Sequence, residues 1–203
     1  MNRFNINTSI FFISILLFCI TIFQSSADAR YASIVIDEQT GKVLHASNPD
    51  RQRYPASLTK MMTLYMVFDA LDRGKLKLNQ RLRVSRRAQG MAPSKLGLKR
   101  GQSITVKDAI LALITKSAND VAVVVAESLG KTEINFAKMM TRKARTLGMR
   151  KTRFRNASGL PNRRQVSTAR DMATLARKLI TDFPQFYHLF KTQRFSYKRR
   201  TYR

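Results

Sequence analysis

The sequence YPASLTKMMT runs from Tyr54 to Thr63 and places a serine and a lysine three positions apart, at the head of an apolar run that continues to Leu71. Positions i and i+3 lie on one face of an α-helix, so we expect the Lys60 amine near the Ser57 hydroxyl. A serine hydroxyl is a weak nucleophile until a base takes its proton, and a desolvated amine can be that base. The run is apolar nearly all round, which predicts a buried helix with a reactive pair at its entrance.

The spacing S-x-x-K is weak by itself, because a chain of ordinary composition contains it about once per few hundred residues. Ser128 and Lys131 fit it too, but they lie at a predicted helix C-terminus across a glycine, where the i,i+3 geometry is lost. Ser57 is instead expected at a helix N-terminus, where free N–H groups favour developing negative charge. The alternative is that Ser57 is a simple N-cap, but the helix dipole disfavours a cation such as Lys60 in the first turn.

A second polar motif, Ser117-Ala118-Asn119, interrupts two apolar helical segments. A hydroxyl and an amide at such a break can relay a proton and bind a peptide-like substrate. The alternative is a helix–helix turn that uses serine and asparagine as caps, which is common.

The remaining pattern alternates between short strands and helices and contains no internal repeat. It predicts a first hairpin over 31–47, the buried helix over 58–71, a short strand over 81–85 and a loop over 88–101. It then predicts helices over 105–114, 120–129, 133–147 and from Ser167 or Thr168 to Ile180, with a last strand over 193–197.

The chain begins like an exported protein. Ile10 to Phe23 is an apolar segment of signal-peptide length, and Ala27-Asp28-Ala29 supplies a small-x-small cleavage pattern. We therefore expect residues 1–29 to be a signal peptide and residues 30–203 to form one domain outside the cytoplasm, in the periplasm or at the outer face of the membrane. An uncleaved N-terminal anchor is the alternative, with the same location for the domain.

Composition excludes several kinds of site. The only cysteine, Cys19, lies within the predicted signal peptide, which removes disulfides and thiolate chemistry from the exported domain. The chain has two histidines, far apart in sequence, which argues against a metal centre. The formal charge of +26 is spread along the chain, which with export argues against nucleic acid. It fits an anionic membrane surface, an anionic cell-wall polymer or simply a solvated basic surface.

S-x-x-K followed by S-x-N is the pattern of the serine penicillin-recognising enzymes. With the surrounding stretches PASLTKMMT, SAND and NASGLPN, the sequence resembles the D-alanyl-D-alanine carboxypeptidases of the low-molecular-mass penicillin-binding group, peptidase family S11. The resemblance runs from about Tyr31 to the end of the chain, and its three stretches occur in the family's order.

The resemblance implies an α+β fold, with an antiparallel sheet covered by helices and a helical part that carries S-x-N. It implies that Ser57 is the acylated nucleophile, Lys60 its general base, Ser117 a proton relay and Asn119 a substrate-binding residue, with no cofactor. The implied substrate is the peptidoglycan stem peptide ending in D-Ala-D-Ala, and β-lactam antibiotics would acylate the same serine.

The family's third motif, Lys-Thr-Gly, is absent from the 203 residues. We therefore expect the chain to be the N-terminal part of the family domain, with an exposed sheet edge and with a site whose electrophilic wall is incomplete. A β-lactamase or D,D-endopeptidase on the same scaffold, or a non-catalytic cationic protein that binds the envelope, remains open at this point.

Overall fold

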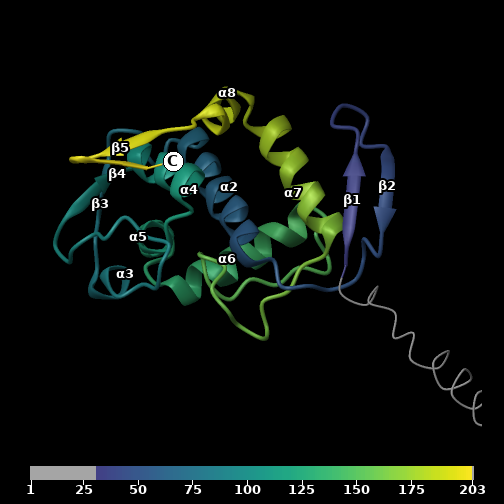
Figure 1. Ribbon diagram of the computed structural model, residues 1–203, viewed down its shortest axis with the longest axis horizontal. Coiled ribbons are helices and arrows are strands. Elements are labelled where there is room, and N and C mark those ends of the chain that lie inside the picture. The colour runs from purple at the N-terminus through teal and green to yellow at the C-terminus, as the bar shows by residue number, and fades with distance from the viewer. Residues whose placement is uncertain (1–30, 203) are drawn as a thin grey trace, which may run out of the picture. The chain divides into compact units, whose positions relative to one another are not determined.

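The computed structural model describes residues 31–202, and helix α2 (Thr59–Asp72) runs through the middle of that part of the chain (Figure 1). A single 3-10 turn, η2 (Ala56–Leu58), precedes it. Every residue from Met62 to Phe68 is buried, so the predicted buried helix is confirmed. A helix that is covered on all sides needs no polar face, which is why its sequence lacks one.

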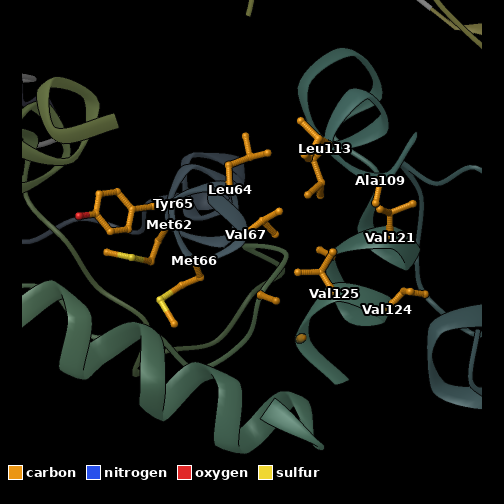
Figure 2. Close-up of a cluster of buried hydrophobic side chains, with 14 of the residues drawn as sticks. Met62, Leu64, Tyr65, Met66, Val67, Ala109, Leu113, Val121, Val124 and Val125 are labelled. Carbon is orange, nitrogen blue, oxygen red and sulfur yellow. The ribbon is translucent and has the colours of Figure 1, made fainter. Parts of the chain in front are cut away.

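Four helices of 11 to 14 residues contact α2 and form the core with it. In the close-up of Figure 2, Leu64 and Val67 of α2 lie on the side of Leu113, Val121 and Val125. These helices are α4 (Val106–Lys116), α5 (Asn119–Gly130), α6 (Glu133–Thr146) and α7 (Ala169–Asp182).

An aromatic cluster packs around Phe68, in the C-terminal half of α2. Phe68 packs edge-on against Phe183 and stacks on Phe186, with ring centroids 5.9 and 4.9 Å apart. Such ring pairs add to the burial energy of the side chains themselves. The cluster includes residues of the short segments α8 (Pro184–Tyr187) and η3 (His188–Lys191), which the sequence pattern did not predict.

The described strands form three separate antiparallel pairs. These are β1 (Ser33–Ile36) with β2 (Val43–Ser47), β3 (Arg81–Arg83) with β4 (Ser103–Thr105), and β5 (Phe195–Tyr197) with β6 (Arg200–Tyr202). Helix α7 lies beside β1 (Figure 1), and its Arg177 donates hydrogen bonds to the carbonyls of Glu38 and Gln39 in the hairpin turn. The fold is therefore mixed α+β, as predicted.

Two strands and one short helix differ from the expectations. Strand β4 ends at Thr105, whose side chain also caps α4 by accepting from Asp108 N at 3.0 Å. The sequence pattern assigned Thr105 to the start of the next helix, so β4 was missed, and Arg200–Tyr202 has no apolar alternation, so β6 was missed. Helix α3 (Arg86–Gln89) extends into the predicted loop 88–101, with Ser85 as its N-cap.

The predicted signal peptide, residues 1–29, lies outside the described residues. Between residues 31 and 202, no helix combines the length and the apolar character that a membrane span needs.

Candidate active site

Ser57 lies exposed in turn η2, directly before the buried helix. The preceding residue, Ala56, has φ of +45°, a left-handed conformation that L side chains rarely adopt. Such a conformation costs about 1 kcal/mol and persists only where the surroundings enforce it. The backbone that presents the Ser57 hydroxyl is therefore held by other parts of the chain.

One of those parts is Gly159, which lies against the Ala56 backbone. A Cβ atom added to Gly159 would come within 1.9 Å of the Ala56 carbonyl oxygen and 3.1 Å of Ser57 N. The φ of Gly159 is +87°, a second reason for glycine at this position. The segment Asn156–Leu160, which we call the clamp turn, therefore touches the main chain of the candidate nucleophile.

The clamp turn also holds Lys60. The Lys60 side chain is 4 % exposed, and its amine donates a hydrogen bond of 2.6 Å to the main-chain carbonyl of Ser158. Burial lowers the pKa of Lys60 from 10.5 to about 8, because desolvation penalises the ammonium form. Within residues 31–202 the amine makes no hydrogen bond to Ser57, so the predicted pair shares one helix entrance without a direct bond.

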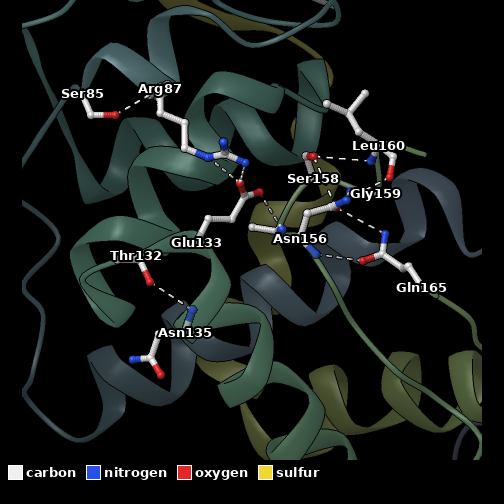
Figure 3. Close-up of polar contacts among 12 residues, drawn as sticks. Ser85, Arg87, Thr132, Glu133, Asn135, Asn156, Ser158, Gly159, Leu160 and Gln165 are labelled. Carbon is white, nitrogen blue, oxygen red and sulfur yellow. Dashed lines mark hydrogen bonds and ion pairs between the residues drawn. The ribbon is translucent and has the colours of Figure 1, made fainter. Parts of the chain in front are cut away.

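Side-chain amides fix the shape of the clamp turn (Figure 3). Asn156 Oδ1 accepts from Gly159 N at 2.7 Å, and Asn156 Nδ2 donates to the carbonyl of Leu160 at 2.9 Å. Gln165 Oε1 accepts from the backbone N–H groups of Arg155 and Asn156 at 2.8 and 3.0 Å. These bonds restrain the backbone on both sides of Ser158, whose carbonyl meets the lysine.

A buried carboxylate anchors the clamp turn to helix α6. Glu133 Oε1 accepts from Ala157 N at 3.1 Å, while Oε2 accepts from the Arg87 guanidinium (Figure 3). On the other side, Thr63 Oγ1 donates to the Ala157 carbonyl at 2.8 Å. The chain of contacts runs from Arg87 through Glu133 and Ala157 to the carbonyl that binds Lys60.

The S-x-N triplet lies where α4 ends and α5 begins, as predicted. Ser117 is half-buried in a left-handed conformation, with φ of +53°. Asn119 is the first residue of α5, and its Nδ2 donates to the carbonyls of Ala92 and Pro93, each at 3.0 Å. Its Oδ1 accepts no hydrogen bond in the described part of the chain, so an acceptor remains for a ligand N–H group.

Both helices that carry the triplet contact α2, which carries Lys60. No hydrogen bond among residues 31–202 joins Ser117 or Asn119 to Ser57 or Lys60. The fold thus brings helices α2, α4 and α5 together, but within the described residues no direct hydrogen bond links the polar side chains of the two motifs. A substrate bound between them would have to complete the site.

Asp120 is a residue whose importance sequence reasoning missed. Its buried carboxylate accepts four backbone N–H groups, from Leu96, Gly97, Leu98 and Val121, at 2.9 to 3.1 Å. These bonds fasten the loop before β4 to the start of α5, directly after Asn119. The available signal was the aspartate of the SAND string, in the first turn of an apolar helix.

The second S-x-x-K match has a different geometry. Ser128 lies near the C-terminal end of α5, and Lys131 follows the end of that helix with φ of +63°. The two residues therefore do not share a helical face, as expected. In the described residues, no three His, Cys, Asp or Glu side chains are grouped closely enough to hold a metal ion.

An apolar hollow of about 360 Å³ opens beside the candidate nucleophile, and we call it the apolar pocket. Ala56 and Gly159 form its wall next to Ser57. Tyr54, which is 67 % exposed, also lines it, together with Leu160 and Arg163. The apolar pocket offers room for part of a ligand next to an exposed hydroxyl and a buried amine.

Comparison with known proteins identifies relatives over most of the chain. The family model Peptidase_S11, D-alanyl-D-alanine carboxypeptidase, matches residues 21–203. D-alanyl-D-alanine carboxypeptidase DacF of Bacillus subtilis is 38 % identical over 149 residues, which cover 73 % of this chain and 38 % of DacF. DacC of Escherichia coli is 36 % identical over 185 residues, or 88 % of this chain and 46 % of DacC.

The structural comparison agrees. Penicillin binding protein 5 from Haemophilus influenzae superposes with a TM-score of 0.81 at 33 % identity, over 84 % of this chain and 51 % of that protein. This chain spans less than half the length of DacF and DacC. The family match covers nearly all of it, and the chain therefore belongs to the peptidase S11 family of D-alanyl-D-alanine carboxypeptidases.

Proposed function

We propose that this chain carries the acylating site of a serine-type D-Ala-D-Ala carboxypeptidase, which removes the terminal D-Ala from peptidoglycan stem peptides during cell-wall biogenesis. The observation that supports this most strongly is the buried Lys60 amine, with its pKa lowered to about 8, one helical turn from the exposed Ser57. A neutral amine next to a serine is the combination that activates a hydroxyl for attack.

In the proposed reaction, Ser57 Oγ attacks the carbonyl carbon of the penultimate D-Ala and Lys60 takes the hydroxyl proton. The helix N-terminus that follows Ser57 favours the negative charge that develops on the carbonyl oxygen. The peptide C–N bond breaks, the terminal D-Ala leaves with a proton relayed by Ser117, and an ester to Ser57 remains. Water then hydrolyses this ester and regenerates the serine.

Asn119 is assigned to substrate binding, since its Oδ1 can accept from a peptide N–H group. The name of the structural relative, penicillin binding protein 5, supports the proposal that β-lactams acylate Ser57 as substrate mimics. We further propose that the chain is exported behind a signal peptide of residues 1–29, and that residues 30–203 act in the periplasm or at the outer face of the cytoplasmic membrane.

Covalent labelling with a fluorescent penicillin tests the assignment of Ser57. The wild-type chain should become labelled, Ser57→Ala should not, and Ser128→Ala should be labelled like the wild type because it changes only the second S-x-x-K match. Equal labelling of Ser57→Ala and the wild type would refute the assignment.

Release of D-Ala from a pentapeptide then separates the possible activities. Labelling together with D-Ala release supports the carboxypeptidase. Cleavage of the β-lactam ring with rapid turnover, or of peptide cross-links alone, would indicate a β-lactamase or an endopeptidase instead. Binding to peptidoglycan without any labelling would indicate a non-catalytic envelope-binding protein.

A further inference from the structure

A second hollow, of about 400 Å³, is lined almost entirely by cations, and we call it the arginine groove. In the described part of the chain, no carboxylate is among its lining residues. Its charged lining consists of Arg145, Arg150, Lys151, Arg153, Arg163 and Arg164.

Four of these six cations have no partner among the residues that the structure describes. Lys151 forms an ion pair of 3.4 Å with Asp50, and the Arg145 guanidinium donates to the carbonyl of Met149. Within residues 31–202, the side chains of the other four arginines make neither an ion pair nor a hydrogen bond. The buried Asp171 carboxylate does not line the groove, and its Oδ2 accepts from Lys151 N and Thr152 Oγ1.

Backbone pairing holds the like charges together. Arg153 and Val166 exchange two backbone hydrogen bonds, of 2.8 and 3.1 Å, so the segment around residue 153 runs antiparallel to the segment that contains Arg163 and Arg164. Cations held this close repel one another and lower the stability of the fold. An anion that enters the groove would relieve this repulsion.

The arginine groove adjoins the apolar pocket beside Ser57. Arg163 lines both hollows, and the apolar pocket continues to Ala56, the residue before Ser57. A chain-like ligand that reaches the Ser57 hydroxyl can therefore extend through the apolar pocket toward the arginines.

We propose that the arginine groove is a second, non-catalytic binding site for peptidoglycan, which holds carboxylates of the polymer while Ser57 acts on a stem peptide. This inference rests on the proposed function. Guanidinium groups match carboxylates with paired hydrogen bonds, which makes arginine better suited than lysine to this task. A narrow polymer can enter a hollow, whereas the planar headgroup surface of a bilayer contacts mainly side chains that protrude. The hollow therefore favours a polymer over a bilayer as the ligand.

Co-sedimentation of the full chain with purified peptidoglycan sacculi tests the proposal. The triple variant Arg150→Gln, Arg153→Gln, Arg164→Gln should bind at least about tenfold more weakly at low ionic strength, where charge interactions are least screened. The matched control is Arg83→Gln, Arg86→Gln, Arg100→Gln, which removes three charges from another basic hollow. Its affinity for sacculi should change about twofold or less.

Equal weakening by the two variants would overturn the proposal, since net charge alone would then explain binding. If the triple variant lost binding to phosphatidylglycerol vesicles but kept its binding to sacculi, the result would overturn the proposal in favour of a membrane contact. If the triple variant does not fold, Arg164→Gln alone should weaken binding about threefold, and an unchanged affinity would refute the site.

Penicillin labelling of the triple variant separates this proposal from the proposed function. Labelling of Ser57 should persist when the arginine groove is neutralised. A wild-type chain whose Ser57 is never labelled would refute the acylation step, whereas unchanged sacculus binding by the triple variant would refute the groove alone.

Discussion

The Lys60 amine donates its hydrogen bond to the main-chain carbonyl of Ser158, which lies 98 residues further along the chain. A carbonyl only accepts, so this bond uses one amine hydrogen and leaves the lone pair of the neutral amine available to a proton. The position of the candidate base is therefore set by the clamp turn as much as by helix α2.

The first prediction concerns the pH dependence of acylation. Only the neutral form of Lys60 can take a proton from Ser57, and burial lowers its pKa to about 8. The rate of acylation by a penicillin should therefore rise with pH and level off above about pH 8. Stopped-flow labelling between pH 6 and 10 measures this, and Lys60→Ala should abolish the rise; full acylation by Lys60→Ala would exclude Lys60 as the base.

The second prediction concerns stability. The pKa of Lys60 is about 8 in the folded chain and near its ordinary value of 10.5 when unfolded, so between these values the unfolded chain binds more protons. The free energy of unfolding should then rise with pH across this window, relative to Lys60→Met. Urea unfolding at pH 7, 8, 9 and 10 measures the difference, which should stay constant below pH 8 and grow above it. A difference that is constant throughout would mean that the lysine is not desolvated.

The third prediction concerns the contact between the clamp turn and Ala56. Gly159→Ala places a Cβ atom 1.9 Å from the Ala56 carbonyl oxygen, in a backbone that cannot easily move. It should lower the free energy of unfolding by about 3 kcal/mol or more and strongly slow labelling of Ser57.

Gly148→Ala is the matched control for this clash. Gly148 has φ of +86°, nearly that of Gly159, but a Cβ there would meet no atom within 4 Å. It should cost only about 1 kcal/mol from the backbone conformation and leave labelling unchanged. Similar effects of the two substitutions would mean that the contact with Ala56 is not what matters.

The main elements of the fold could be predicted because each has a strong local signal. The apolar run predicts α2 and its burial, and Thr168 caps α7 by accepting from Asp171 N at 3.1 Å, as the pattern indicates. The paired strands β4 and β6 have three residues each, and their pairing depends on partners elsewhere in the chain. Strands β3 and β5 are equally short but were predicted from their own residues, whereas β4 and β6 lack a comparable local pattern.

In the candidate site, too, some residues could be predicted from the sequence and others could not. The spacing of polar residues identified the candidates Ser57, Lys60, Ser117 and Asn119, because the chemical groups involved belong to side chains and can be read from the sequence. The hydrogen-bond partner of Lys60 could not be predicted. Every residue has a main-chain carbonyl, so the sequence does not indicate that the carbonyl of Ser158 is the one that binds the amine. The clamp turn lies within the NASGLPN stretch of the family resemblance, but nothing in that stretch predicts its contact with Lys60.

The fourth prediction concerns Asp120, which fastens the loop 96–98. Asp120→Asn replaces an acceptor-only group with one that has a single acceptor oxygen and an NH₂ group that faces backbone donors. It should lower the free energy of unfolding by about 2–4 kcal/mol and speed amide hydrogen exchange in the loop. Asp108→Asn, in the first turn of α4, is the control and should cost about 0.3–1 kcal/mol. Equal costs would show that the loop bonds contribute little.

The last prediction concerns Glu133, which acts on Lys60 through the clamp turn. Glu133→Ala leaves the Ala157 N–H group without its acceptor and should admit water around Ser158. Because burial is what lowers the pKa of Lys60, hydration should raise that pKa toward 10.5 and move the acylation profile to higher pH. Glu133→Gln keeps an acceptor oxygen for Ala157 and should restore most of the wild-type profile.

The control for Glu133 is Glu127→Ala, a partly exposed glutamate of α5 that makes no hydrogen bond or ion pair among the described residues. It should leave both stability and the profile unchanged. Loss of stability in Glu133→Ala with an unmoved profile would mean that Glu133 supports the fold without tuning the base. A shifted profile that Glu133→Gln restores would instead make Glu133 a positioning residue for Lys60, because a purely structural role would not move the pH at which acylation rises.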